Sequence, residues 1–292
     1  MRMNAYCQRC LRDKRLNAFP RDAAPERVET YRQRVTELIR SGTHLCTPEV
    51  DYAIGQVYRE LFGAPRDFSA INHHFNALML DLEPDLAADV ARAADPLARA
   101  VQYAMMGNFI DFAALDNVEE GKLRALLDGA ADVPVDAGML SALREEVTGA
   151  RSLAFFTDNC GEIVADKVLL RALRALNPGM SVTVVVRGEP TGNDATLADA
   201  AQVGLDSVAD RVIGNGTGIP GNPMGRISPE AGAVARSADV LIAKGQANYE
   251  SMSGCGLNVF YIFMCKCALF MDRFRVPQYS GILTREGAVR FD

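Results

Sequence analysis

The stretch Leu153-Ala-Phe-Phe-Thr-Asp-Asn-Cys-Gly-Glu162 joins an apolar run to a polar turn. Its first four residues are unbroken hydrophobics, and apolar residues recur at roughly helical spacing after Glu162, so the pattern predicts a strand, a turn and a helix. Asp158 and Asn159 then lie where the strand ends and the helix begins. In an open α/β sheet this is where ligands bind, because the strand ends form a crevice and the helix start presents unpaired N–H groups.

The same stretch also has a plainer interpretation. Asn159 and Glu162 match a capping box, in which a polar N-cap residue is reciprocated three residues later. Glu162 would then either orient the ligands of a functional site or only cap the helix. Both interpretations stay open on the sequence.

From Ala150 onward, the hydrophobic pattern alternates between strands and helices. The apolar runs fall at 153–156, 182–186, 211–213, 240–243 and 259–264, and the helical stretches near 162–176, 195–204 and 229–237. Strand and helix in alternation predict crossover connections and a mostly parallel sheet. We therefore expect a Rossmann-like α/β domain over residues 150–292. It has no GxGxxG motif after its first strand, and its glycine-rich stretch at 214–222 lacks the P-loop lysine, so nucleotide binding is disfavoured.

The first half of the chain is helical almost throughout. Apolar residues recur at helical spacing from Glu26 to Thr148. One helix is expected to end at Ser41-Gly42, and others at about 48–61, 67–80, 83–93, 96–107, 118–128 and 136–148. Residues 1–149 are predicted to form an α-helical domain. Its histidines, His44, His73 and His74, are interpreted as structural or surface residues, since adjacent helical residues point about 100° apart and cannot share one metal ion.

Composition excludes several classes of protein. The 292 residues are 49% hydrophobic and 23% charged, and the net charge of -6 argues against a nucleic-acid or anionic-membrane binder, which would carry a basic face. No segment reaches the ~20 apolar residues of a membrane span. Seven cysteines, an odd number, fit a reducing compartment, so a cytoplasmic protein is expected. Cys7-Gln-Arg-Cys10 is a CxxC pair without a second such pair, which makes a structural zinc site a weak hypothesis. The sequence makes no prediction of oligomeric state.

Polar residues follow three of the predicted strands. Asp158 and Asn159 follow the first, Arg187 and then Asp194 the second, and Lys244 ends the strand at 240–243. Because these strand ends share one edge of a parallel sheet, we expect the side chains to meet in one crevice. Two carboxylates and an amide oxygen are hard ligands suited to Mg²⁺ or Mn²⁺, and a lysine opposite them could neutralise a phosphate.

Taken together, a set of motifs in this chain resembles the damage-control phosphatases, long catalogued as a domain of unknown function. The motifs are Cys7-x-x-Cys10, Gly107-Asn-Phe-Ile-Asp111, Asp158-Asn-x-Gly-Glu162, Asp166-Lys167, Asn193-Asp-Ala-Thr196 and Lys244-Gly-Gln-Ala-Asn-Tyr-Glu250. The CxxC and Lys-Gly-Gln motifs are similar to those of the prokaryotic branch. The resemblance implies an all-helical amino-terminal domain on a Rossmann-like α/β domain. It also implies a divalent metal ion at Asp158, Asn159 and Asp194 and a phosphate contact at Lys244.

The implied activity is metal-dependent hydrolysis of a small phosphorylated metabolite, with Mn²⁺, Mg²⁺, Co²⁺ or Ni²⁺ as cofactor. Asn108 and Asp111 would close the site from the helical domain, and Glu162 and Arg187 are further candidate substrate contacts. One branch of the family has also been described as protein carboxyl methyltransferases, so methyl transfer from S-adenosylmethionine is an alternative. A non-enzymatic protein that binds a metal ion or a metabolite is another.

Overall fold

The computed structural model of the protein describes residues 1–108, 124 and 127–289. Its α-helices are α1 (Ala5–Arg15), α2 (Pro25–Ser41), α3 (Thr47–Phe62), α4 (Ser69–Arg92), α5 (Pro96–Gly107), α7 (Ala137–Gly149), α8 (Glu162–Leu176), α9 (Leu197–Gln202), α10 (Pro229–Ser237), α11 (Gln246–Met252) and α12 (Ala268–Phe274). Short 3₁₀ turns are η1 (Gly42–His44), η3 (Gly129–Asp132) and η4 (Leu205–Ser207). The strands are β1 (Ser152–Phe156), β2 (Ser181–Val186), β3 (Arg211–Gly214), β4 (Val240–Lys244), β5 (Val259–Met264) and β6 (Gly281–Arg285).

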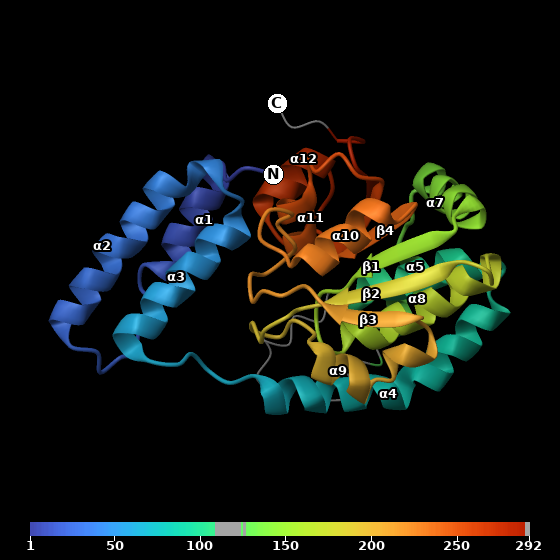
Figure 1. Ribbon diagram of the computed structural model, residues 1–292, viewed down its shortest axis with the longest axis horizontal. Coiled ribbons are helices and arrows are strands. Elements are labelled where there is room, and N and C mark those ends of the chain that lie inside the picture. Colours follow the sequence, from blue (N-terminus) through green and yellow to red (C-terminus); the bar gives the residue numbers. More distant parts are fainter. Residues whose placement is uncertain (109–123, 125–126, 290–292) are drawn as a thin grey trace.

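A six-stranded sheet in the order β3-β2-β1-β4-β5-β6 forms the centre of the α/β part (Figure 1). Strands β1 to β5 are parallel, whereas β6 pairs antiparallel with β5. The sheet confirms the predicted mostly parallel α/β architecture. Strand β6 was not predicted, because this short edge strand has only three buried residues and no following helix to mark it.

The two faces of the sheet bury alternate residues of each strand, as the two-residue period of a strand requires. On β1, Leu153 and Phe155 join one hydrophobic core together with residues of α4, α5, α7 and α8. Ala154 and Phe156 join a second core with residues of α10, α11 and α12. Because both faces are covered, the strands read as continuous apolar runs, which explains why they could be recognised in the sequence.

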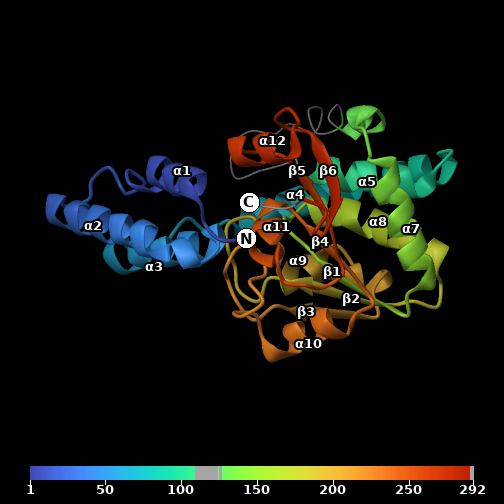
Figure 2. The ribbon, with the colours of Figure 1, turned by 90° about the horizontal axis from the view of Figure 1, so that it is seen from above.

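Helices α1, α2 and α3 form a separate bundle beside the α/β part (Figures 1 and 2). The bundle has its own core, in which Tyr31, Val35 and Ile39 of α2 meet apolar residues of α1 and α3. Helices α4, α5 and α7 instead share the core of the sheet. These three helices therefore pack with the α/β part, although they precede residue 150. The predicted domain boundary after residue 149 stays a prediction.

The structure differs from the predicted helices in two ways: two predicted helices form one, and three helices were not predicted. Helices were predicted at 67–80 and 83–93, but α4 is continuous through Pro84. A proline removes one backbone hydrogen bond, and the buried face of α4 from Phe75 to Val90 maintains the helix across that gap. Short helices α11 and α12, and α1, were not predicted. The expected helix at 118–128 lies mostly outside the described residues.

Two smaller expectations can be compared with the described part of the chain. His44, His73 and His74 are exposed, in agreement with their interpretation as surface residues. None of the helices in the described ranges has both the length and the apolar character that crossing a membrane requires.

Leu170, a fully buried residue on α8, tests the importance of this helix for the core. We expect Leu170→Ala to lower the free energy of unfolding by about 2–5 kcal/mol, because the change removes buried methyl groups and leaves a cavity. Urea denaturation followed by circular dichroism measures the loss. Leu197, which is 49% exposed, serves as the control, and its alanine variant should change stability by less than about 0.5 kcal/mol. Equal effects of the two changes would contradict the assignment of α8 to the core.

Candidate functional site

The loops that follow β1 and β2 are hydrogen-bonded to each other along their backbones. The Ala195 N–H donates to the Asp158 carbonyl oxygen at 2.8 Å, and the Cys160 N–H donates to the Asn193 carbonyl oxygen at 2.8 Å. An isolated β-bridge joins Asn159 and Asp194. The structure therefore brings Asp158, Asn159 and Asp194 together, although 35 positions separate the last two in the chain.

Arg187 lies between the two aspartates of this group. Its guanidinium donates from Nε to Asp194 Oδ2 at 2.5 Å, and its Nη2 lies 3.5 Å from Asp158 Oδ1. Its Nη1 donates to the Gly221 carbonyl oxygen at 2.9 Å. The side chain is 1% exposed, and its buried Nη2 forms no hydrogen bond with the described residues. Arg187 therefore holds the carboxylates in place, while its Nη2 group stays without a hydrogen bond to the described residues.

Asn108 and Glu162 complete the group from α5 and α8. The Asn108 Nδ2 group donates to Asp158 Oδ2 and to Glu162 Oε2, both at 3.0 Å. The Asn159 Nδ2 group donates to the same two oxygens, both at 2.9 Å. The Asn108 Oδ1 atom accepts from the Met264 N–H at 2.9 Å, which fixes the orientation of that amide. Asn108 thus reaches the strand ends as predicted, while Asp111 lies outside the described residues.

Lys244 was predicted to contact a phosphate in the crevice, but its side chain points into the protein interior. The side chain is fully buried, and its ammonium donates to Glu162 Oε1 at 2.5 Å, Asp166 Oδ1 at 2.6 Å and the Ala104 carbonyl oxygen at 2.9 Å. An ammonium has three N–H groups, so all its donors have protein acceptors. The predicted phosphate contact would require one of these bonds to break.

A relay of three buried asparagines ties the strand-end loops to one another. The Gly188 N–H donates to Asn215 Oδ1 at 2.8 Å, Asn215 Nδ2 to Asn222 Oδ1 at 2.9 Å, and Asn222 Nδ2 to Asn248 Oδ1 at 2.6 Å. Asn248 Nδ2 then donates to the carbonyl oxygens of Thr157 and Lys244 at 3.0 and 2.6 Å. The relay contacts the ends of β1, β2, β3 and β4. The glycine-rich stretch at 214–222 is therefore a structural part of the site.

The electrostatics of the group favour an additional cation. Burial, followed by the neighbouring Asp194 and Glu162, raises the pKa of Asp158 well above its usual value. Burial also raises the pKa of Asp166 to about 7, although Lys244 opposes this shift. Burial acts in the same direction on Glu162, but Lys244, together with Asn108 and Lys266, outweighs it and the pKa of that carboxyl is lowered.

The donor set fits a hard divalent ion. The Asn159 Oδ1 atom accepts no hydrogen bond from residues 1–108, 124 and 127–289, because the amide donates from its Nδ2 end to Asp158 Oδ2 and Glu162 Oε2. The β-bridge between Asn159 and Asp194 brings the backbone of Asp194 next to the same residue. Among the described residues, no group of three His, Cys, Asp or Glu side chains is arranged for a metal ion. The candidate donors that the two loops bring together are two carboxylates and an amide. Oxygen donors of this kind suit Mg²⁺ and Mn²⁺. Cys7 and Cys10 are free thiols, and neither belongs to a metal-binding cluster of His, Cys, Asp or Glu within the described part of the chain.

Lys266 was missed by the sequence analysis. It follows β5, at the same edge of the sheet, and is partly exposed. Its positive charge acts to lower the pKa of both Asp158 and Glu162. The available signal was its position just after the buried strand β5, the same signal that identified Lys244.

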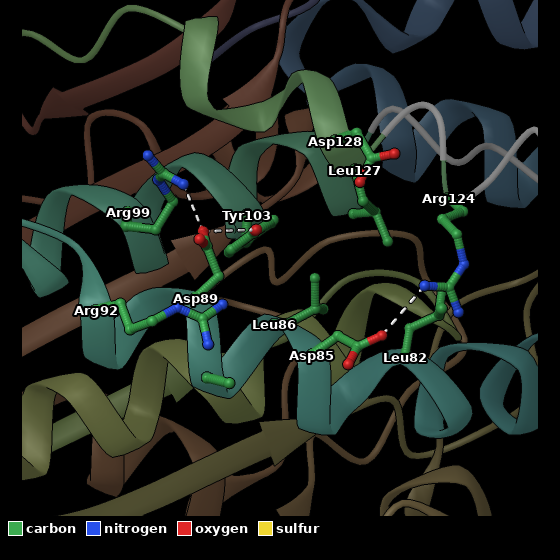
Figure 3. A pocket seen from close by; sticks show the side chains of 11 residues that line it. Leu82, Asp85, Leu86, Asp89, Arg92, Arg99, Tyr103, Arg124, Leu127 and Asp128 are labelled. Atoms are coloured by element: carbon green, nitrogen blue, oxygen red, sulfur yellow. Dashed lines mark hydrogen bonds and ion pairs between the residues drawn. The ribbon is translucent and has the colours of Figure 1, made fainter.

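Two cavities lie near the helical part of the chain. One of about 570 Å³ lies between the α1–α3 bundle and the loops after β2 and β3, where Thr191, Gly192 and Pro220 face Tyr52 and Tyr58. The other, of about 340 Å³, lies between α4, α5 and the segment near Leu127 (Figure 3).

The cavity in Figure 3 contains its own ion pairs. Arg99 and Tyr103 both point toward Asp89, and Arg124 points toward Asp85. None of the predicted site residues lines it. None of them lines the larger cavity either, but its wall includes Thr191 and Gly192 of the loop that carries Asp194, and its volume is in the range of small-molecule sites.

These features define a Rossmann-like α/β protein with an acidic site at the carboxyl edge of its sheet. The sequence model of the family described as "Damage-control phosphatase ARMT1-like domain" matches residues 3–282. The chain belongs to this family, as the motifs indicated.

Individual relatives agree with this assignment. A damage-control phosphatase of Pyrococcus horikoshii is 33% identical over 190 residues, and the match spans 64% of this chain and 64% of the relative, just under two thirds. A damage-control phosphatase of Archaeoglobus fulgidus is 28% identical over 210 residues, or 71% of this chain and 72% of the relative. The crystal structure of a DUF89 family protein from Pyrococcus horikoshii shares the fold, with a TM-score of 0.79 at 23% identity over 98% of this chain and 99% of that one.

Gly245 tests the packing around the acidic group. A Cβ atom at this position would lie 1.9 Å from Asp158 Oδ2, and the backbone has φ +80°. If the acidic group binds Mn²⁺, the ion should raise the melting temperature of the wild-type protein, measured by thermal unfolding with and without the ion. We expect Gly245→Ala to displace Asp158 and to abolish that rise. Gly225→Ala, where no atom lies within 4 Å, is the matched control and should keep the full rise. An unchanged response of Gly245→Ala to Mn²⁺ would contradict this account.

Proposed function

We propose that the protein is a metal-dependent phosphatase that hydrolyses monoesters of small phosphorylated metabolites. The observation that carries this proposal is the joining of Asp158, Asn159 and Asp194 by the β1 and β2 loops at the carboxyl edge of the sheet. Membership of the damage-control phosphatase family supports the reaction class.

In this proposal the two carboxylates and the Asn159 amide oxygen hold the divalent ion. When bound, the ion supplies positive charge that stabilises the phosphoryl oxygens in the transition state. Mn²⁺, Mg²⁺, Co²⁺ and Ni²⁺ are the candidate ions. The Asp158 carboxyl, whose charge is disfavoured by burial and then by its carboxylate neighbours, gains a compensating charge from such an ion.

Cationic side chains would bind the rest of the phosphate. Lys266 is partly exposed and follows β5 at the same edge of the sheet as the carboxylates, so we propose that it contacts the non-bridging oxygens. Arg187, whose buried Nη2 group has no hydrogen bond to the described residues, is a second candidate contact. The remainder of the metabolite would occupy the cavity of about 570 Å³ between the α1–α3 bundle and the loops after β2 and β3.

The metal requirement is tested with metal-stripped protein and an aryl phosphate, titrated in turn with Mg²⁺, Mn²⁺, Co²⁺ and Ni²⁺. We expect turnover only after a metal ion is added. Asp158→Ala and Asp194→Ala should each lower kcat/KM by at least about a hundredfold, since loss of a transition-state electrostatic contact has effects of this size. Metal-dependent turnover that survives both changes would disprove the assignment of the site.

Asp206→Ala is the control for these two variants, because Asp206 is an exposed carboxylate in η4 of the same half of the chain. It should retain the wild-type rate and metal dependence. Far-UV circular dichroism of every variant shows whether the helices remain folded. If no metal ion supports turnover of the aryl phosphate or of natural phosphomonoesters, the protein is instead a binding protein or a methyltransferase.

The phosphate contact has its own test. We expect Lys266→Met to raise KM roughly tenfold or more while the affinity for the metal ion changes little, because a hydrogen bond to a charged group contributes about 1.5–3 kcal/mol. Steady-state kinetics at saturating metal measure the change. Wild-type KM in Lys266→Met would exclude this residue from substrate binding.

A further inference from the structure

The buried ammonium of Lys244 is fully committed to protein acceptors. Its three bonds reach two carboxylates of α8 and a carbonyl of α5, at 2.5 Å to Glu162, 2.6 Å to Asp166 and 2.9 Å to Ala104. The side chains of Lys244, Glu162 and Asp166 are all 0% exposed. A residue in this position acts on the site through the groups that it holds.

Glu162 transmits that effect, because its two oxygens serve different partners. Oε1 accepts from Lys244, whereas Oε2 accepts from the side-chain amides of Asn159 and Asn108 and, at 3.3 Å, from the Asn159 backbone N–H. With Oε1 fixed by the ammonium, the carboxylate cannot rotate without breaking one of these bonds. Lys244 therefore determines where Oε2 lies.

The position of Oε2 determines which end of the Asn159 amide faces the acidic group. The Nδ2 atom donates to Glu162 Oε2 and to Asp158 Oδ2, both at 2.9 Å, so both of its N–H groups are used. The Oδ1 atom is then the end left for a cation. An amide rotated by half a turn has nearly the same shape but would present N–H donors to that cation.

We propose that Lys244 is a positioning residue: by fixing Glu162 it holds the Asn159 amide with its oxygen available to the metal ion, and it does not bind phosphate. This inference rests on the proposed metal site at Asp158, Asn159 and Asp194. The two lysines at this edge of the sheet then have different roles: Lys266 contacts the phosphate, and Lys244 supports the metal ligands.

The test compares Lys244→Met with Lys266→Met in two measurements. The first is the affinity of metal-stripped protein for Mn²⁺, measured by isothermal titration calorimetry without substrate. The second is the inhibition constant of inorganic phosphate at saturating Mn²⁺. We expect Lys244→Met to weaken Mn²⁺ binding about 10–100-fold, the usual effect of removing a residue that orients metal ligands, with an unchanged inhibition constant for phosphate. Lys266→Met should show the reverse pattern.

Lys167→Met is the matched structural control. Lys167 is also a buried lysine, and its ammonium donates to Glu83 Oε2 at 3.1 Å and the Val203 carbonyl oxygen at 2.8 Å, but it does not contact Glu162. Its methionine variant should lose stability and keep the wild-type affinity for Mn²⁺. If Lys244→Met does not fold, Lys244→Met combined with Asp166→Asn replaces it, because that protein buries one uncompensated carboxylate instead of two.

Two results would overturn the inference. One is a raised inhibition constant for phosphate in Lys244→Met with wild-type Mn²⁺ affinity, which would make Lys244 a phosphate contact. The other is an equal loss of Mn²⁺ affinity in Lys244→Met and Lys167→Met, which would make the effect one of general stability. Failure of the proposed function gives a separate signal, because Asp158→Ala would then bind Mn²⁺ as tightly as the wild-type protein does.

Discussion

The cost of removing ionised groups from water governs the carboxyl edge of this sheet. A single buried charge without a partner costs several kcal/mol, so each buried ion requires an opposite charge and hydrogen bonds in defined positions. Lys244 meets this requirement with acceptors from α8 and α5, although it belongs to β4 itself. One ammonium group thus links a strand, the helix after β1 and a helix encoded far earlier in the chain.

The same constraint explains why the acidic group is compact. Arg187 contacts both Asp158 and Asp194, and the Asn108 and Asn159 amides each contact Asp158 and Glu162. The neutral amides of Asn108 and Asn159 and the guanidinium of Arg187 lie between the carboxylates and donate hydrogen bonds to them. Burial, followed by repulsion from Asp194 and Glu162, raises the pKa of Asp158, and a divalent cation at the proposed site would offset both effects.

Much of this arrangement could be predicted from the sequence. The apolar runs defined the parallel strands, and the residues after β1 and β2 identified Asp158, Asn159 and Asp194, because parallel strands end at one edge. The sequence could not show whether a lysine at the end of β4 faces solvent or the helix layer, so the environment of Lys244 was missed. One feature of the sequence could have indicated a buried partner for Lys244: Glu162 and Asp166 are four residues apart and therefore share a face of α8. The continuity of α4 through Pro84 depends on tertiary packing and has no local signal.

The asparagine relay below the site has a direction. Each amide accepts at its oxygen and donates from its nitrogen, and the two ends of the relay are fixed, at the backbone N–H of Gly188 and at the carbonyl oxygens of Thr157 and Lys244. Reversing one amide would oppose donor to donor on one side and acceptor to acceptor on the other. The loops after four strands therefore keep all these bonds or lose them together, so the edge of the sheet should open as a single cooperative unit instead of fraying loop by loop.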